Sequence, residues 1–280
     1  MARLGANRYG KSRVRLSRIT RHADRHDFQE WTVHVLLEGD IEASYTAADN
    51  SNVLPTDTMK NTVYSVARDS ESQTIEAFAM ELGDFFLDHQ SQVSSVSIGV
   101  EEKAWERVQV RETPEPTTFQ LRGGELQTVR AERRRGGVWS ITSGVEGLVI
   151  LKTTHSAFTG FLVDKLTTLK PATDRILGTS ASARWEFATR NADYATTRAR
   201  ILRTLLQVFA GHESKSVQHT LFDMGTAALD AAPEIARITL SMPNLHHLLA
   251  DLSRFGQENP NHIFVPIDEP HGTIEAIVER

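Results

Sequence analysis

The sequence predicts an α+β protein in which helices cover antiparallel sheets. Apolar residues follow a period of two, then of 3.6, then of two again, and this succession occurs twice along the chain. Strands that are grouped apart from helices favour antiparallel sheets over an alternating βαβ order. With 280 residues, the chain is long enough for two domains of roughly 140 residues each. Each half is therefore expected to contain two strands, helices, and two further strands.

In the first half, alternating apolar residues predict the strands. Val14 and Leu16, for example, alternate with basic or polar neighbours. A turn-rich segment over 47–55 is followed by a helix whose apolar face consists of Ile75, Phe78, Leu82 and Phe85. The strands are expected over 13–19, 31–37, 93–100, 105–111 and 119–129.

The second half repeats this scheme loosely. One helical face carries Ile201, Leu205 and Phe209, and another carries Val217, Leu221, Met224 and Ala228. Strands are expected over 145–152, 182–189, 235–242 and 263–267. The arginine- and glycine-rich turn over 133–137 indicates a boundary, with a first domain over 1–136 and a second over 137–280.

Composition excludes several classes of function. The chain has no cysteine, which rules out disulfides, thiolate metal sites and cysteine nucleophiles. A net charge of −5 disfavours a general affinity for nucleic acid. Neither a secretory signal nor an apolar run long enough to cross a membrane is found, and the last residues are not a peroxisomal Ser-Lys-Leu address. A cytoplasmic location is expected.

The segment that begins at Pro55 opens a helix, and two interpretations of its polar residues are open. Thr56 or Asp57 could cap free backbone N–H groups. Alternatively, the partial positive charge at the helix start suits an anion, and the Thr56 hydroxyl can relay a proton. Lys11, before the first strand, is either a solvated lysine or, if partly buried, a base near neutral pH.

Asn244 and His246 stand two positions apart in a segment that resembles the end of a strand. Residues with this spacing project from the same face, while Leu245 and His247 point the other way. An amide beside an imidazole could hold water or dioxygen and move a proton. The alternative is a pair of polar residues in a terminal turn.

Three further residues suit a flat, anionic ligand. Ser216 is a plausible helix cap, so that Gln218 would lie in the first turn and offer both a donor and an acceptor. Arg175 could bind a planar anion through its guanidinium, or pair with Asp174. Phe158 could stack on a ring or belong to the core.

His22 and His26 could meet on a helix, because they stand four positions apart. Their surroundings are charged but contain no third convincing ligand, so no metal site is expected there.

Taken in order, these segments closely resemble the urate oxidase (uricase) family, and the resemblance spans nearly the whole chain. The absence of the peroxisomal address makes the sequence similar to a bacterial member. The matching segments are Tyr9-Gly10-Lys11, Pro55 to Tyr64, Leu151 to Phe158, Thr168-Leu169-Lys170, Asp174 to Leu177, Ser216-Val217-Gln218 and Pro243 to His246.

The resemblance implies two tandem tunnelling-fold domains, each a four-stranded antiparallel sheet with helices on its concave face. It also implies a homotetramer whose active sites lie where subunits meet, and oxidation of urate by dioxygen without a cofactor. The implied roles are proton transfer by Lys11, Thr56 and His246, and substrate binding by Thr56, Asp57, Phe158, Arg175, Val217, Gln218 and Asn244.

The sequence leaves two rival functions open. Another tunnelling-fold enzyme acting on a pterin or purine typically anchors the ring with a glutamate, where this chain has Gln218. A non-catalytic purine-binding protein needs no proton relay, yet Lys11, Thr56, Asn244 and His246 are all present.

Overall fold

The computed structural model describes residues 2–267 and 269–280. The chain divides into two compact units, Met1–Val145 with Glu186–Ala195, and Glu146–Trp185 with Thr196–Arg280. This division falls within a strand rather than at the arginine-rich turn, and the domain boundary after residue 136 stays a prediction. Each unit is described by itself.

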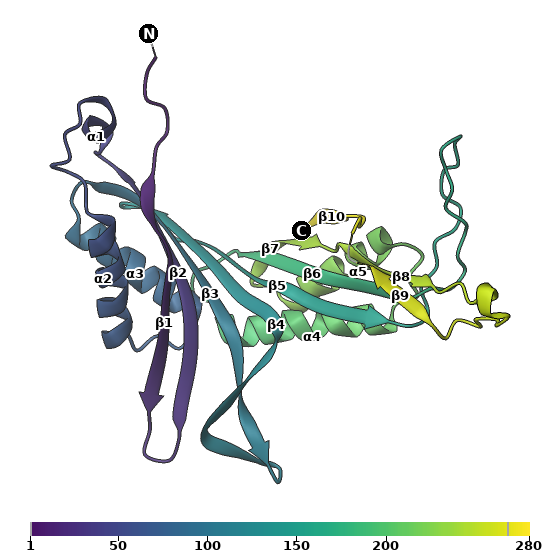
Figure 1. The fold of residues 1–280 in the computed structure, drawn as a ribbon. Coiled ribbons are helices and arrows are strands. Elements are labelled where there is room, and N and C mark those ends of the chain that lie inside the picture. The colour runs from purple at the N-terminus through teal and green to yellow at the C-terminus, as the bar shows by residue number, and fades with distance from the viewer. Residues whose placement is uncertain (1, 268) are drawn as a thin grey trace. The chain divides into compact units, whose positions relative to one another are not determined.

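The first unit is an antiparallel sheet with helices against one face (Figure 1). The strand order is β1-β2-β3-β4, with every neighbouring pair antiparallel. All predicted strands of this half are present, but the two expected over 93–100 and 105–111 form one continuous strand. The elements are β1 (Tyr9–Arg21), β2 (His26–Gly39), α1 (Glu42–Thr46), α2 (Thr56–Asp69), α3 (Ile75–His89), β3 (Val93–Val110) and β4 (Thr113–Arg134).

The core of this unit lies between α2, α3 and the sheet. Trp31 on β2 packs against Phe78 on α3, with ring centroids 4.6 Å apart. The predicted face of α3 needs one correction, because Phe85 is 36% exposed whereas Phe86 is 1% exposed. Residue 86 stands eleven positions after Ile75, about 20° past three full turns, so it lies nearer the centre of the buried face.

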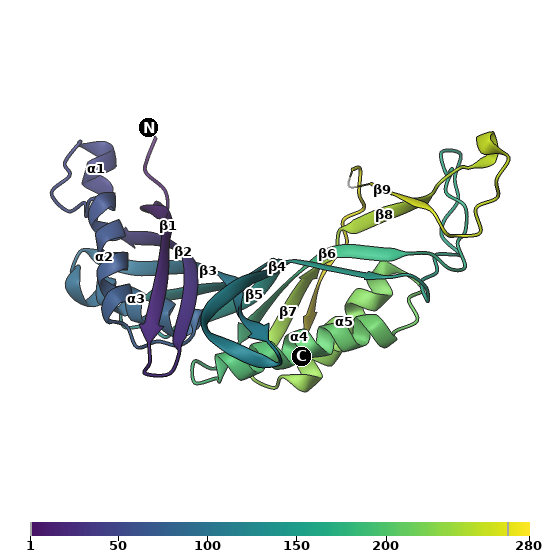
Figure 2. The same cartoon turned by 60° about the horizontal axis from the view of Figure 1, so that its bottom comes forward.

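The second unit repeats the arrangement (Figure 2). Its main strand order is β5-β6-β7-β10, and β8 pairs with both β6 and β9. The segment of β8 was expected only as the end of a strand, and β10 was not predicted. The elements are β5 (Ser140–Lys152), β6 (Leu177–Phe187), α4 (Tyr194–Gly211), α5 (Val217–Ala231), β7 (Ile235–Ser241), β8 (Asn244–Leu249), a 3-10 turn (Ser253–Phe255), β9 (Phe264–Ile267) and β10 (Glu275–Glu279).

The predicted apolar faces of α4 and α5 form the core of this unit. Ile201 and Leu205 on α4, and Leu221 and Met224 on α5, are each at most 1% exposed. Gly225 allows α5 to approach β10, because a Cβ at this position would lie 2.6 Å from Val278 Cγ2. Among the helices of the described residues, none combines the length and apolar character of a membrane span.

Candidate active site

A pocket of about 360 Å³ lies in the second unit. Its wall is built from the segment between β5 and β6, the start of α5, and β8. It brings together all the predicted site residues of the second half, namely Phe158, Arg175, Val217, Gln218, Asn244 and His246. These residues are separated by as many as 88 positions in sequence, so the sheet pairing of β6 with β8 is what places them around one cavity.

Arg175 is a half-buried cation that forms no ion pair with any carboxylate of the described chain. Burial lowers the pKa of its guanidinium, and its Nε is buried without a hydrogen-bond partner. The alternative pairing with Asp174 does not occur, because that carboxylate accepts from Thr154 Oγ1 at 2.6 Å and from the Ser156 amide at 3.2 Å. A buried cation without an acid partner favours an anionic ligand.

Phe158 supplies the aromatic surface of the pocket. Its ring lies 5.2 Å from the Arg175 guanidinium carbon and stacks on Phe161, with centroids 5.0 Å apart and planes inclined by 14°. Its amide and carbonyl both bond to Ala172, which holds the segment before Arg175 against it. Phe158 is therefore fixed beside the cation.

The start of α5 presents donors to the same pocket. Ser216 is the N-cap, and its hydroxyl accepts from the His219 amide at 3.1 Å, as predicted. Val217 and Gln218 then occupy the first turn, where backbone N–H groups have no partner within the helix. Val217 is 5% exposed, whereas the Gln218 side chain is exposed at the pocket wall. This end of the helix can therefore donate to an anion or a carbonyl edge.

Asn244 and His246 project from the same face of β8, as their spacing predicts. Asn244 Nδ2 and His246 Nδ1 are 3.1 Å apart, and Asn244 is only 8% exposed. Pro243 lies between β7 and β8, which agrees with its expected place at a strand end. The pair gives the pocket an amide and an imidazole that share a hydrogen bond.

Lys11, Thr56 and Asp57 belong to the first unit, where they are neighbours. The Leu54 amide donates to Tyr9 Oη at 2.8 Å, which ties the start of β1 to the segment before α2. Lys11 projects from the same face of β1 as Tyr9. The pKa of Asp57 is lowered mainly by the hydrogen bond from Lys60, and the charge of Lys11 lowers it further.

The capping interpretation of Thr56 and Asp57 is wrong. Pro55 is the N-cap of α2 and Thr56 is its first residue, with no side-chain cap bond. Asp57 instead binds Lys60 Nζ at 2.5 Å and Asn61 Nδ2 at 3.2 Å. The exposed Thr56 hydroxyl is thus not used to cap its helix.

A β-bulge follows Lys11. The register between β1 and β2 shifts between Lys11 and Val14, and Arg13 has a φ of 60°. Gly10 permits the close pairing that precedes it, since a Cβ there would lie 1.8 Å from the Val35 carbonyl oxygen. Bulges redirect the side chains beside them, and this one lies next to the predicted base.

The pocket also contains residues that the sequence did not indicate. His247 was expected to point away, yet it lines the wall, as do Lys170 and Ile274. Lys170 lies in one of the segments that resemble the uricase family, so this resemblance could have indicated it. Ile274 directly precedes β10 and is brought to the pocket by the pairing of that strand. No sequence motif near Ile274 indicates this position.

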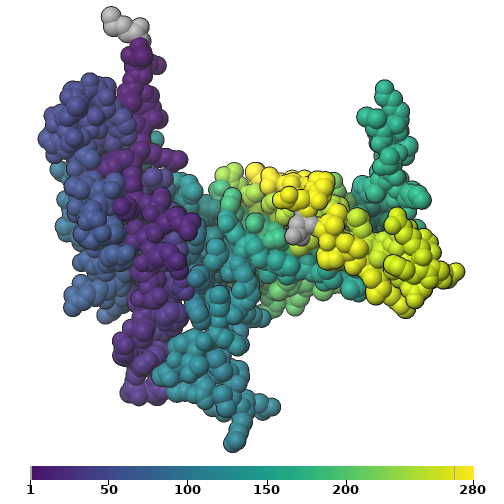
Figure 3. Space-filling view, viewed as in Figure 1, coloured from purple at the N-terminus to yellow at the C-terminus, as the bar shows by residue number. Residues whose placement is uncertain are grey.

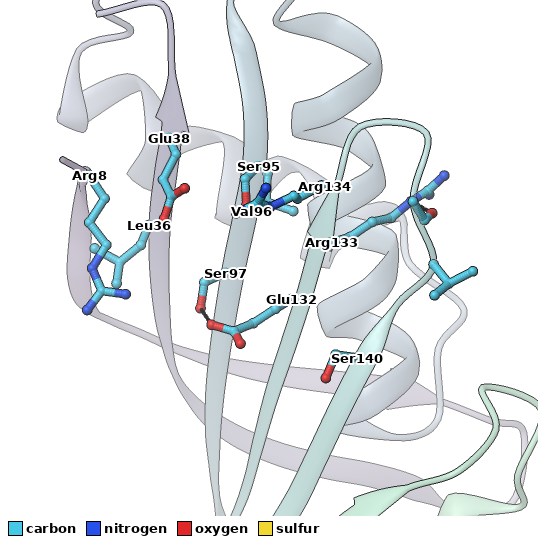
Figure 4. Close-up of a pocket in the computed structure, with 12 residues that line it drawn as sticks. Arg8, Leu36, Glu38, Ser95, Val96, Ser97, Glu132, Arg133, Arg134 and Ser140 are labelled. Atoms are coloured by element: carbon cyan, nitrogen blue, oxygen red, sulfur yellow. Dashed lines mark hydrogen bonds between the residues drawn. The ribbon is translucent and has the colours of Figure 1, made fainter. Parts of the chain in front are cut away.

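A second pocket, of about 440 Å³, lies in the first unit (Figure 4). It is lined by both arginines and glutamates, including Arg8, Arg134, Glu38 and Glu132. Ser97 Oγ donates to Glu132 at 2.9 Å. These mixed charges do not select an anion, and no predicted site residue lies there.

His22 and His26 do not share a helix. They flank the turn between β1 and β2, where His22 Nε2 lies 2.7 Å from Asp27 Oδ2. The spacing of four is therefore part of a hairpin.

Comparisons with known proteins agree with this architecture. The uricase family model matches residues 7–132 and 141–275. The chain is 42% identical to a uricase of Arthrobacter globiformis over 99% of its own length and 90% of that protein, and 36% identical to a uricase of Dictyostelium discoideum over 100% and 98%.

Solved structures give the same result. The crystal structure of the Arthrobacter globiformis uricase matches with a TM-score of 0.94 and 41% identity, covering 100% of this chain and 96% of that one. A uricase from Bacillus fastidious matches with a TM-score of 0.85 at 23% identity, over 98% and 94%, which supports the fold alone. The predicted α+β tunnelling fold is thereby confirmed, and the chain belongs to the uricase family.

Proposed function

We propose that this protein is a urate oxidase, which converts urate, dioxygen and water to 5-hydroxyisourate and hydrogen peroxide. Urate supplies the two electrons that reduce dioxygen, and water supplies the oxygen atom of the new hydroxyl group. The reaction belongs to purine catabolism. Family membership supports this assignment.

The observation that carries the proposal is the environment of Arg175. This half-buried cation has no acid partner among the described residues, and it faces a pocket that also holds an aromatic ring and an exposed amide side chain. Urate is a planar anion, so its charge would satisfy the guanidinium and its ring would lie against Phe158.

Gln218 and the Val217 amide complete the set of residues that would hold urate, which we call the clamp and which also includes Arg175 and Phe158. A glutamine side chain both donates and accepts, which matches adjacent C=O and N–H groups on the edge of a lactam ring. The Val217 N–H group at the start of α5 adds a donor for a ligand oxygen. A ring with two donors side by side would fit this edge less well.

Lys11 and Thr56 form the proton-transfer pair in this proposal. The Thr56 hydroxyl relays the proton that urate must lose, and Lys11 accepts this proton as the base. Asp57 supports the ligand through its backbone. His246 completes the relay, while Asn244 positions dioxygen or water over the ring. The contact between Asn244 and His246 supports this division of roles.

No metal or organic cofactor has a step in the proposed reaction. Once urate is deprotonated, its electron-rich ring can transfer electrons to dioxygen directly. The protein then contributes orientation and electrostatic stabilisation.

The enzyme is proposed to be a homotetramer whose sites combine two chains. Lys11 and Thr56 lie in the first unit, and the residues of the clamp lie in the second. The segment between β5 and β6 projects from its unit (Figure 3) and exposes Leu162 by 85% and Leu166 by 79%. Exposed apolar residues of this kind support an interface with another copy.

Steady-state turnover of urate tests the assignment. Purified protein is expected to consume urate and dioxygen and to release hydrogen peroxide, and Gln218→Glu is expected to raise the Michaelis constant for urate. A protein that binds urate without consuming it would reject the enzyme assignment.

A further inference from the structure

Two histidines and an aspartate meet at the surface of the second unit, outside the pocket described above. His212 lies just after α4, and His219 and Asp223 lie one turn apart on α5. One potential ligand atom from each lies within 4.8 Å of the other two. We propose that His212, His219 and Asp223 form a binding site for a divalent transition-metal ion, with zinc as the best match.

The distances fit such a site after a small adjustment. Asp223 Oδ2 lies 3.0 Å from His212 Nδ1 and 3.8 Å from His219 Nε2. Zinc bonds of about 2.0–2.1 Å in tetrahedral geometry separate neighbouring ligand atoms by about 3.3 Å. The 3.8 Å distance between His219 Nε2 and Asp223 Oδ2 must therefore shorten, and a rotation of the exposed His219 side chain can supply this.

The ligand types select the ion. Two imidazoles and one carboxylate form the set found at zinc and other transition-metal sites, whereas calcium and magnesium favour oxygen ligands. Three protein ligands leave the fourth position to water. His219 is 48% exposed and Asp223 is 39% exposed, so solvent can reach this position.

His212 is the anchored member of the set. Its side chain is 12% exposed, and its Nδ1 lies 3.0 Å from Asp223 Oδ2. Its Nε2 is buried and has no hydrogen-bond partner among the described residues. The centroids of the two imidazole rings are 4.6 Å apart, and the Asp223 carboxylate approaches a nitrogen of each ring. An ion bound by both rings would offset the cost of holding these polar groups together.

A neighbouring cation, Lys152, does not fill the site. Lys152 directs its ammonium group to the backbone carbonyls of Phe209 and His212 rather than to the Asp223 carboxylate. Its charge weakens cation binding, and the Glu213 carboxylate offsets part of that effect.

The site joins the α4–α5 connection to the first turns of α5. His219 directly follows Gln218, and the connection that holds His212 leads to the Ser216 cap. A bound ion would therefore cross-link the α4–α5 connection to α5 and so stabilise the folded second unit. This role is structural and does not depend on the proposed oxidation.

The test uses the full-length chain without an affinity tag, stripped with chelator and titrated with zinc. We expect one zinc ion per chain, and a rise in the thermal unfolding midpoint. Cobalt in place of zinc should give the visible absorption of a nitrogen- and oxygen-ligated ion. His219→Gln and Asp223→Asn should each lower zinc affinity at least about tenfold, a loss comparable to that from removing supporting groups around a metal.

His22→Gln is the matched control, because it breaks an exposed histidine–aspartate pair outside the cluster. It should leave zinc affinity unchanged. His219 is exposed, so its substitution should not prevent folding, which circular dichroism would verify. Absence of zinc binding by the wild-type chain, or equal affinity in the folded His219→Gln and Asp223→Asn variants, would overturn the proposal.

Discussion

Replacing Arg175 by methionine should separate a ligand-binding role from a structural one. The guanidinium is partly buried, its Nε has no partner, and no carboxylate of the described residues pairs with it. Methionine fills similar space without a charge. Because an unpaired buried charge is costly, the substitution should leave the thermal midpoint unchanged or raise it.

The expected loss of substrate binding is large. Two charge-assisted hydrogen bonds from a guanidinium contribute about 1.5–3 kcal/mol each. Even the lower value, about 3 kcal/mol in total, corresponds to a loss of roughly 100-fold in kcat/KM, at 1.4 kcal/mol for each factor of ten.

Steady-state kinetics and calorimetry on the same samples would measure both quantities. Arg203→Met provides the control, since Arg203 is an exposed arginine on α4 of the same unit, and it should change neither. A kcat/KM within threefold of wild type, or a clear fall in the midpoint, would refute the ligand-binding role of Arg175.

Three other perturbations probe separate parts of the account. Lys11→Met and Thr56→Val should each slow turnover by roughly 10²-fold, and the double variant should lose little more, because the two residues act as a unit; multiplicative losses would argue against a coupled pair. Co-expressed Lys11→Ala and Arg175→Ala chains, each inactive alone, should regain about a quarter of wild-type activity if sites form between two-fold related chains, whereas inactive mixed oligomers would exclude such sites. Hydrogen bonds, first that from Lys103, hold the pKa of Glu30 below its ordinary value. Its stabilising effect is therefore complete above the unfolded pKa of about 4.3 and is lost as pH falls through the lower folded value. Glu30→Gln should accordingly cost about 1 kcal/mol at neutral pH, and this difference should close in acid; a gap in unfolding midpoints that stays constant down to pH 3 would contradict the sign.

Local sequence signals predicted those features that depend on short-range geometry. The period-two spacing placed Asn244 and His246 on one face, and the Ser216 cap located the first turn of α5. Both depend on a few neighbouring residues, because strand alternation and helix capping are local. Residue chemistry and then the family motifs made Arg175 and Phe158 candidates, but their contact needs the folded chain.

Features set by long-range pairing were missed. The bulge after Lys11 depends on the register with β2, and no residue near Lys11 specifies that register by itself. Strand β10 is defined by its pairing with β7, which also brings Ile274 to the pocket. The turn containing His22 was ambiguous because a spacing of four fits both a helix and a hairpin.

The most direct test of the central claim is urate turnover by protein that has been exhaustively dialysed against chelator and shows no visible chromophore. The account predicts that urate absorbance disappears at the full rate, with one dioxygen consumed and one hydrogen peroxide released for each urate. Activity that is absent from such protein and returns only with added metal or flavin would contradict it.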